Sequence, residues 1–187
     1  MALSQSIAVG VLLAAGAGRR YGKPKVLVEG WLDTAVDALQ DAGCAEVVLV
    51  LGAAQVPVPA GVTAVTASDW AQGLSASVRA GLTEADRLGA DYAVLHVVDT
   101  PDVGPAVVAR VLERALASSS GLARASFGDR PGHPVVIARR HWPDVLAQLS
   151  GDEGAGAYLR SRGDVEVVDC SDLAVGLDID EDFDERA

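Results

Sequence analysis

Short apolar runs alternate with longer amphipathic segments along most of this 187-residue chain. The short runs are rich in Val, Ile and Leu and are bounded by glycine, proline or charged residues, which is typical of buried strands. They predict strands at Ile7–Leu13, Glu46–Leu51, Val62–Thr66 and Tyr92–Val98. The longer segments predict helices at Thr34–Ala42, Leu74–Leu88 and Gly104–Ala117. This alternation favours an α/β fold, a Rossmann-like, mostly parallel sheet with helices on both faces.

After the third predicted helix the pattern changes to two neighbouring strands. Leu122–Phe127 and Pro134–Ala138 are predicted to form a hairpin whose loop is Gly128–His133. No internal repeat interrupts the chain, and its length suits one domain over residues 1–187.

Composition narrows the class of protein. Half of the residues are hydrophobic but only 4% are aromatic, so Ala, Val and Leu must build the core. A formal net charge of −11 argues against non-specific binding to nucleic acid. No apolar run is long enough to span a bilayer and the first residues lack a basic signal-peptide start, so we expect a cytoplasmic protein without a membrane anchor. Cys44 and Cys170 lack metal-ligand spacing and are expected to be buried free thiols.

The first predicted strand runs directly into a glycine-rich, cationic loop. Its glycines are expected to take a positive φ and to bring bare backbone N–H groups close to an anion, and basic side chains add positive charge. The loop contains Gly16, Gly18, Gly22, Arg19, Arg20, Lys23 and Lys25. In an acidic chain this local excess of cations predicts a polyphosphate site. The alternative interpretation is a solvated basic turn.

Two common nucleotide-binding fingerprints do not fit this loop. The dinucleotide motif should open a helix and be followed by an acidic residue at the end of the second strand. Pro24 interrupts such a helix, and the second strand is followed by Gly52. The Walker pattern G-x-x-x-x-G-K-[ST] does not occur.

Aspartates supply candidate metal ligands at two places. Asp99 follows an apolar strand and should lie at the same sheet edge as the first loop, where a carboxylate suits Mg²⁺. It could instead cap the next helix or end a turn. Asp178 and Asp180 would point to the same side of an extended segment, although a solvated acidic tail would look the same.

Two further segments carry polar groups that could face a ligand. Trp70 is followed by Gly73 and then by Ser75 and Ser77 at a helix start, where amides and hydroxyls can serve a ligand. Helix capping alone would also explain Ser75. His133 lies in an Arg-Pro-Gly-His-Pro segment, and a structural role is the default for a lone histidine.

Taken together, these segments resemble the MobA-like NTP transferase family. The loop is similar to the family signature L-A-A-G-x-G-x-R-x-G-x-P-K, and the Ala14-Ala15-Gly16 variant resembles the molybdenum cofactor cytidylyltransferases. The W-x-x-G, D-x-P, P-G-H-P, S-G-D-x-G-A and D-I-D segments recur in the family's order. The chain departs from the usual pattern at Tyr21 and Thr100, and the loop after Lys25 is shorter.

The resemblance implies a nucleotidyltransferase fold and a reaction. CMP would pass from Mg²⁺-bound CTP to the terminal phosphate of a molybdopterin-type acceptor, with a molybdoenzyme as recipient of the product. The implied catalytic residues are Lys25, Arg19 and Asp99. Leu13, Ala14, Ala15, Gly16, Gly18, Gly73 and Ser75 would complete the nucleotide site. Asp99, Asp178 and Asp180 would hold the metal, and Ser77, His133 and Asp152 would contact the acceptor.

Three other functions remain open from the sequence. A related transferase could use GTP or another nucleotide, or a sugar phosphate as acceptor. The altered Tyr21 and Thr100 and the shortened loop also fit a non-catalytic homologue. A dinucleotide-dependent oxidoreductase is disfavoured by Pro24 and by the missing acidic residue after the second strand.

Overall fold

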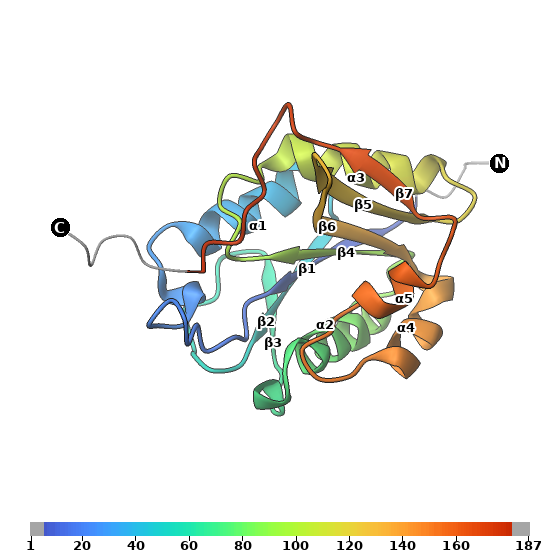
Figure 1. The fold of residues 1–187 in the computed structure, drawn as a ribbon. Helices are drawn as coiled ribbons and strands as arrows, with labels where there is room; N and C mark the ends of the chain where they lie inside the picture. Colours follow the sequence, from blue (N-terminus) through green and yellow to red (C-terminus); the bar gives the residue numbers. More distant parts are fainter. Residues whose placement is uncertain (1–5, 181–187) are drawn as a thin grey trace.

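A single mixed sheet organises the computed structural model, which describes residues 6–180 (Figure 1). Its strands are β1 (Ala8–Leu13), β2 (Glu46–Leu51), β3 (Val62–Thr66), β4 (Tyr92–Val97), β5 (Leu122–Phe127), β6 (Arg130–Ala138) and β7 (Glu166–Asp169). The spatial order in this seven-stranded sheet is β3-β2-β1-β4-β6-β5-β7. β6 runs antiparallel to β4 and β5, and the other neighbouring strands pair in parallel.

Helices cover both faces of this sheet. The α-helices are α1 (Trp31–Asp41), α2 (Leu74–Arg87), α3 (Pro105–Ala117), α4 (Trp142–Gln148) and α5 (Gly156–Arg160). Three short 3₁₀ turns are η1 (Lys25–Leu27), η2 (Trp70–Gln72) and η3 (Arg139–His141). α1 and α3 pack on one face, and α2, α4 and α5 pack on the other (Figure 1). The predicted Rossmann-like arrangement of three layers, α/β/α, around a mostly parallel sheet is thereby confirmed.

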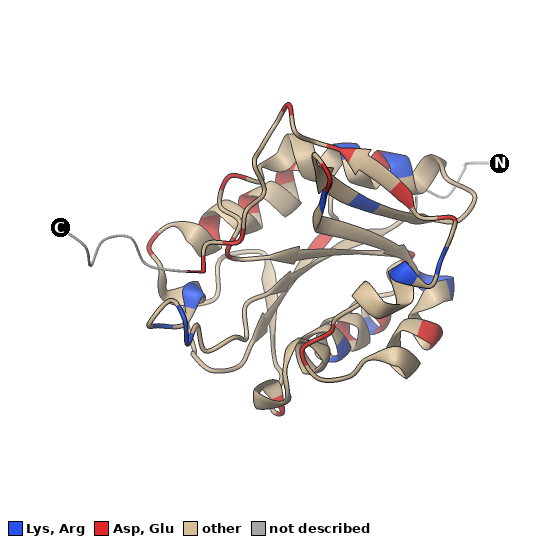
Figure 2. Ribbon diagram, in the orientation of Figure 1, with Lys and Arg blue, Asp and Glu red and all other residues tan. Residues whose placement is uncertain are grey.

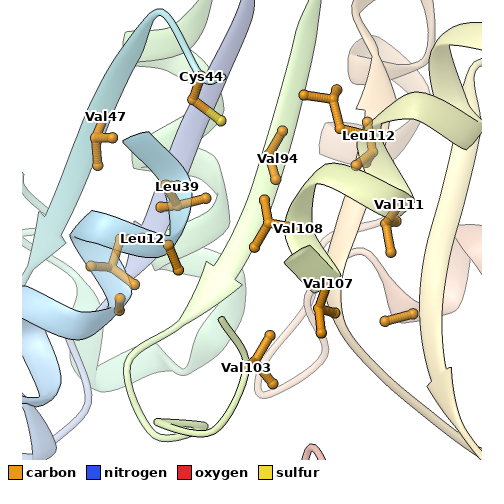
Figure 3. Close-up of a cluster of buried hydrophobic side chains, with 14 of the residues drawn as sticks. Leu12, Leu39, Cys44, Val47, Val94, Val103, Val107, Val108, Val111 and Leu112 are labelled. Atoms are coloured by element: carbon orange, nitrogen blue, oxygen red, sulfur yellow. The ribbon is translucent and has the colours of Figure 1, made fainter. Parts of the chain in front are cut away.

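The central strands are uniformly apolar because both of their faces are covered. Every residue of β1 is buried, and so are the last five residues of β2. On one face, Leu12 of β1 and Val94 of β4 pack against Leu39 of α1 and Val108 of α3 (Figure 3). A separate cluster on the other face joins β1, β2 and β4 to α2. This packing fixes the positions of the strand ends.

The predicted elements are found with small changes at their ends. The first helix begins at Trp31, three residues before the predicted start, because Gly30 takes a left-handed conformation (φ 79°) and ends the preceding turn. The predicted hairpin loop was too long. β6 begins at Arg130, so a tight turn with Gly128 at φ 64° joins it to β5. α4, α5 and β7 were not predicted, because their apolar patterns are short.

Both cysteines are buried and free, as predicted. Burial raises the pKa of the Cys44 thiol to about 12, so this group is an unreactive part of the core. In the described part of the chain, no helix has the length and apolar character required to cross a membrane.

Candidate functional site

The carboxyl ends of β1 and β4 bring the glycine-rich loop and Asp99 to one edge of the sheet. β1 and β4 are parallel neighbours, and Leu13 pairs with Val97 at the last position of their ladder. Residues 14–25 therefore leave the sheet beside Asp99. They border a cleft of about 600 Å³, which is a normal size for a small-molecule site. Parallel α/β sheets bind their ligands at this edge.

Gly18 gives the loop its tight path. Its φ is 60°, and a Cβ on this residue would lie 1.8 Å from the carbonyl oxygen of Lys23. The amide of Gly22 donates to the carbonyl of Gly18 at 2.8 Å and closes the turn. The expectation of a positive φ is confirmed at Gly18 and Gly22 but was wrong for Gly16. A Cβ at Gly16 would meet no protein atom, and the residue lines the cleft instead.

Lys25 lies between two aspartates at the wall of the cleft. Its Nζ is 2.7 Å from Oδ2 of Asp99 and 2.9 Å from Oδ1 of Asp180. Arg20 pairs with the other oxygen of Asp180 at 3.0 Å. Figure 2 shows the basic positions of this loop beside the acidic end of the described chain. The ion pairs connect segments that are 74 and 155 residues apart in sequence.

These contacts set the protonation of the cluster. Burial by itself lowers the pKa of Lys25, but the hydrogen bonds and charges of Asp99 and Asp180 raise it overall. The hydrogen bond from Lys25 lowers the pKa of Asp180. The pKa of Asp178 is raised, first by desolvation and then by the negative charges of Asp99 and Asp180. At Asp178, the negative charges of Asp99 and Asp180 therefore outweigh the positive charges of Lys25 and Arg130.

Backbone and side-chain contacts fix the C-terminal segment beside Asp99. The amide of Ile179 donates to the carbonyl of Asp99 at 3.0 Å. Oδ2 of Asp102 accepts hydrogen bonds from the amides of Val175 and Gly176, at 2.7 and 2.9 Å. Residues 170–180 thus form an ordered strap, and Asp178 and Asp180 lie in it and not in a free tail. Asp102 was missed by the sequence reasoning because no local pattern marks its long-range contacts.

The carboxylate oxygens at this site suit a hard cation whose remaining ligands are phosphate oxygens and water. Oδ1 of Asp99 is buried and has no hydrogen-bond partner among the described residues. Within residues 6–180, no group of three or more potential ligands forms a metal site by itself. Mg²⁺ and Mn²⁺ need only one or two protein carboxylates when phosphate oxygens and water complete the shell. The unsatisfied oxygen of Asp99 fits such a shared site.

The alternative capping roles of Asp99 and Ser75 are not observed, although Asp99 does lie in a turn after β4. The N-cap of α3 is Gly104, and that of α2 is Gly73; neither helix start has a side-chain cap. Ser75 is buried and its amide donates to the carbonyl of Gly151 at 3.0 Å. Ser75 does not line the cleft, so the structure does not bring it to the nucleotide site predicted for it.

The remaining predicted nucleotide-binding residues line the cleft, and so do two predicted metal ligands and two predicted acceptor residues. The predicted metal ligand Asp178 does not line it. The lining includes Leu13, Ala14, Ala15, Gly16, Gly18, Arg19, Lys25, Gly73, Ser77, Asp99, Asp152 and Asp180. Trp70 and Arg20 also line it, although sequence reasoning gave neither a specific role. Tyr21, a departure from the family pattern, also lines the cleft and packs its ring against Trp31 at the start of α1, with centroids 5.5 Å apart.

A second, smaller cavity adjoins the first and contains His133. It has a volume of about 280 Å³ and shares Leu13, Leu74 and Asp152 with the main cleft. Gly73 allows this arrangement, because a Cβ there would lie 2.5 Å from both Oδ1 of Asp152 and the carbonyl oxygen of Gly151. His133 and Asp152 therefore line one cavity, whereas Ser77 lines only the main cleft.

Comparison with known proteins identifies the family. The profile of the MobA-like NTP transferase domain matches residues 10–167. The chain belongs to the MobA-like NTP transferase family. A curated relative, nicotine blue oxidoreductase from Paenarthrobacter nicotinovorans, is 35% identical over 91% of each chain.

Solved structures show the same fold over nearly the whole chain. Rv0371c from Mycobacterium tuberculosis H37Rv superposes with a TM-score of 0.80 at 29% identity, covering 96% of this chain and 95% of that one. A complex of Rv0371c with manganese has a TM-score of 0.75 at 27% identity and covers 96% of both chains. A nucleotidyl transferase from Methanothermobacter, at 22% identity and a TM-score of 0.80 over 95% and 93% of the two chains, shares the fold.

Proposed function

We propose that this protein transfers CMP from Mg²⁺-bound CTP to the terminal phosphate of a molybdopterin-type acceptor and releases pyrophosphate. The observation that carries the proposal is the position of Lys25. Its ammonium lies between Asp99 and Asp180, at the end of a glycine-rich loop that borders the cleft. A cation and carboxylates at one wall of the cleft support a shared site for a triphosphate and a divalent ion.

The chain's own residues would bind and orient the triphosphate. The backbone amides of the loop and the side chain of Arg19 bind the β- and γ-phosphates, since Arg19 lines the cleft without an ion pair among the described residues. Lys25 binds the α-phosphate, where negative charge grows as the reaction proceeds. Positioning and charge stabilisation are the main contributions that a protein makes to such transfers.

The reaction needs no protein nucleophile. An oxygen of the acceptor's terminal phosphate attacks the α-phosphorus, and the bond from that phosphorus to the bridging oxygen of the β-phosphate breaks. Pyrophosphate leaves with the electron pair of that bond. A divalent ion held by Asp99 with Asp178 and Asp180 would neutralise phosphate charge when bound. Manganese in a Rv0371c complex supports a divalent ion for this family, and Mg²⁺ is our proposal for this chain.

The proposed preference for CTP rests on the Ala14-Ala15-Gly16 segment after β1, which resembles the cytidylyltransferases of the family. Ala14 and Ala15 are buried at the start of the cleft. Gly52, which directly follows β2, lies so close that an added Cβ would be 2.8 Å from Cβ of Ala15. The segment is therefore tightly packed on this side. Relative rates with CTP, GTP, ATP and UTP test this choice, and a faster reaction with GTP would replace CTP in the proposal.

The deciding experiment is pyrophosphate release from each nucleotide, with and without molybdenum cofactor, in wild type and Asp99→Ala. Release with CTP that requires the cofactor, a divalent ion and Asp99 would support the proposal. Release with a sugar phosphate in place of the cofactor would identify a different acceptor. Absence of release from a folded protein under all conditions would favour a non-catalytic homologue. The identity of a recipient molybdoenzyme and a cytoplasmic location remain parts of this proposal.

A second candidate function is oxidoreduction with a nicotinamide dinucleotide. The observation in its favour is the 35% identity with a relative named as an oxidoreductase. Against it, the loop after β1 leads into the short turn η1 and not into a helix start, and no acidic residue follows β2. Titration with NADH and NADPH separates the two candidates. Tight binding of either one, without pyrophosphate release from any nucleotide, would favour the oxidoreductase.

A further inference from the structure

The second cavity lies on the sheet face covered by α2 and α5. Leu95 and Val135 form part of its floor, and Leu74, Val78 and Leu159 form its apolar walls. Because it shares Leu13, Leu74 and Asp152 with the main cleft, a ligand could extend from one cavity into the other. Its volume of about 280 Å³ is at the lower end of the range for small-molecule sites. It therefore suits one ring system of a larger ligand.

Arg124 of β5 is the unusual residue of this cavity. Its Nε is buried and has no hydrogen-bond partner, and the guanidinium makes no ion pair among the described residues. Burial lowers the pKa of Arg124, and the nearby charge of Arg160 lowers it further. Arg160 also lines the cavity, but it pairs with Glu153. Asp152 and Glu153 line the same cavity but form no ion pair with Arg124, which is thus a half-buried cation unpaired among the described residues.

The titratable neighbour of Arg124 does not provide a counter-charge. Burial lowers the pKa of His133 to about 4, with Asp99 raising it and Arg124 lowering it. His133 is therefore neutral near pH 7. It offers one ring N–H donor and one acceptor nitrogen at the same cavity. Asp152 is exposed at the boundary with the main cleft.

A partly desolvated guanidinium without a partner destabilises the folded protein, because its lost hydration is not replaced. A ligand oxygen that accepts hydrogen bonds from the guanidinium would replace this lost hydration. The planar fork of arginine matches carbonyl and oxyanion groups in the plane of a ring, and the apolar walls suit the faces of that ring.

We propose that this cavity binds the ring end of the acceptor, a small planar heterocycle bearing an oxo or oxyanion group, and that Arg124 donates hydrogen bonds to that oxygen. The inference rests on the proposed transfer to an acceptor phosphate. That phosphate would lie in the main cleft, and the ring at the other end of the acceptor would lie in the adjoining cavity. It adds a specificity-determining residue that lies outside the motifs of the sequence.

The test is equilibrium binding of pterin (2-amino-4-oxopteridine), followed by its fluorescence, to the full chain. Arg124→Met is expected to weaken binding by about tenfold to a hundredfold, because a charge-assisted hydrogen bond is lost. Arg124→Lys keeps the charge without the fork and should recover only part of the affinity. The matched control is Arg114→Met, since Arg114 is an exposed arginine of α3 that pairs with Glu166 outside both cavities.

Thermal unfolding distinguishes a ligand-binding role from a structural one. Arg124→Met should unfold at the same or a higher temperature than wild type without ligand, since an unpaired charge is replaced by an apolar side chain of similar length. A large decrease in unfolding temperature would show that Arg124 supports the fold and would overturn the proposal. Equal pterin affinity in wild type and Arg124→Met would overturn it too, as would no pterin binding by wild type.

Kinetics separate this inference from the proposed function. Pterin binding that depends on Arg124, in a protein that releases no pyrophosphate, would support ring binding in the cavity and reject the proposed transferase activity. Pyrophosphate release with the same acceptor KM in wild type and Arg124→Met would support the transferase activity and reject the role of Arg124 in binding the acceptor ring. Binding of Mg²⁺–CTP should be the same in both proteins, because Arg124 does not line the main cleft.

Discussion

The Nζ of Lys25 lies 2.7 Å from Oδ2 of Asp99, and this pair joins the glycine-rich loop to the carboxyl end of β4. The two side chains are 13% and 21% exposed, so their interaction is only partly screened by water. The other oxygen of Asp99, Oδ1, is buried without a partner. The carboxylate therefore has one oxygen paired with a cation and one available to a second cation.

Loss of either member of this pair should abolish most of the turnover. Lys25→Ala and Asp99→Asn are each expected to lower the rate of pyrophosphate release about a hundred- to a thousandfold, because each removes charge stabilisation at the reacting phosphates. Lys23→Ala is the control, since Lys23 is exposed and does not line the cleft. Rates for Lys25→Ala within threefold of wild type would contradict the assigned role.

Two glycines of the loop should respond differently to alanine. Gly18→Ala is expected to lower the free energy of unfolding by about 1–3 kcal/mol, because of its positive φ and the contact with the carbonyl of Lys23. Gly16→Ala should leave that free energy unchanged, since a Cβ there meets no protein atom, but should weaken nucleotide binding by narrowing the cleft. Urea unfolding and nucleotide titration measure the two effects, and the reverse pattern would contradict the loop geometry.

The strap that carries Asp178 and Asp180 should set the apparent affinity for the divalent ion. Asp102→Ala removes the acceptor of two backbone hydrogen bonds, from Val175 and Gly176. The metal concentration for half-maximal rate is expected to rise about tenfold, as when a group that orients metal ligands is lost. Asp172→Ala is the control, because Asp172 pairs with Arg110 elsewhere on this segment. Equal metal dependence in the two variants would show that the strap is not required.

Acid should destabilise the protein through His96. This histidine is fully buried, neither ring nitrogen has a partner among the described residues, and burial lowers its pKa to about 3, with a smaller contribution from His133. Below about pH 6.5 the unfolded chain binds a proton that the folded protein excludes. Stability from this site is complete above that pH and falls by about 1.4 kcal/mol per pH unit until the pH approaches the folded pKa.

His96→Leu tests this assignment because leucine keeps the site apolar. The free energy of unfolding should depend less steeply on pH between 6.5 and 4.5 in the variant than in wild type, with carboxylates contributing equally to both. Urea unfolding at several pH values provides the comparison. Parallel pH profiles would assign the acid sensitivity to other groups, among them His133.

The order of strands and helices could be predicted from sequence, because each central strand is a continuous apolar run that needs cover on both faces. Gly16, Lys25 and Asp99 could be assigned to one edge for a related reason, since parallel strands deliver their following loops to the same side. α4 and α5 could not be predicted, because segments of seven and five residues show too little periodicity. For Gly16 a positive φ was expected, but its φ is not positive and a Cβ there would meet no protein atom.

What the sequence determined by itself is thus the local chemistry: apolar strands, a cationic glycine-rich loop and aspartates after β4 and near the C-terminus. The tertiary structure decided which of these groups meet. Lys25 contacts Asp180 across 155 residues, Asp102 holds the strap, and Arg124 lines a cavity without an ion-pair partner among the described residues. Such contacts depend on strand order and on the path of the chain over the sheet, and neither is encoded in the residues adjacent to them.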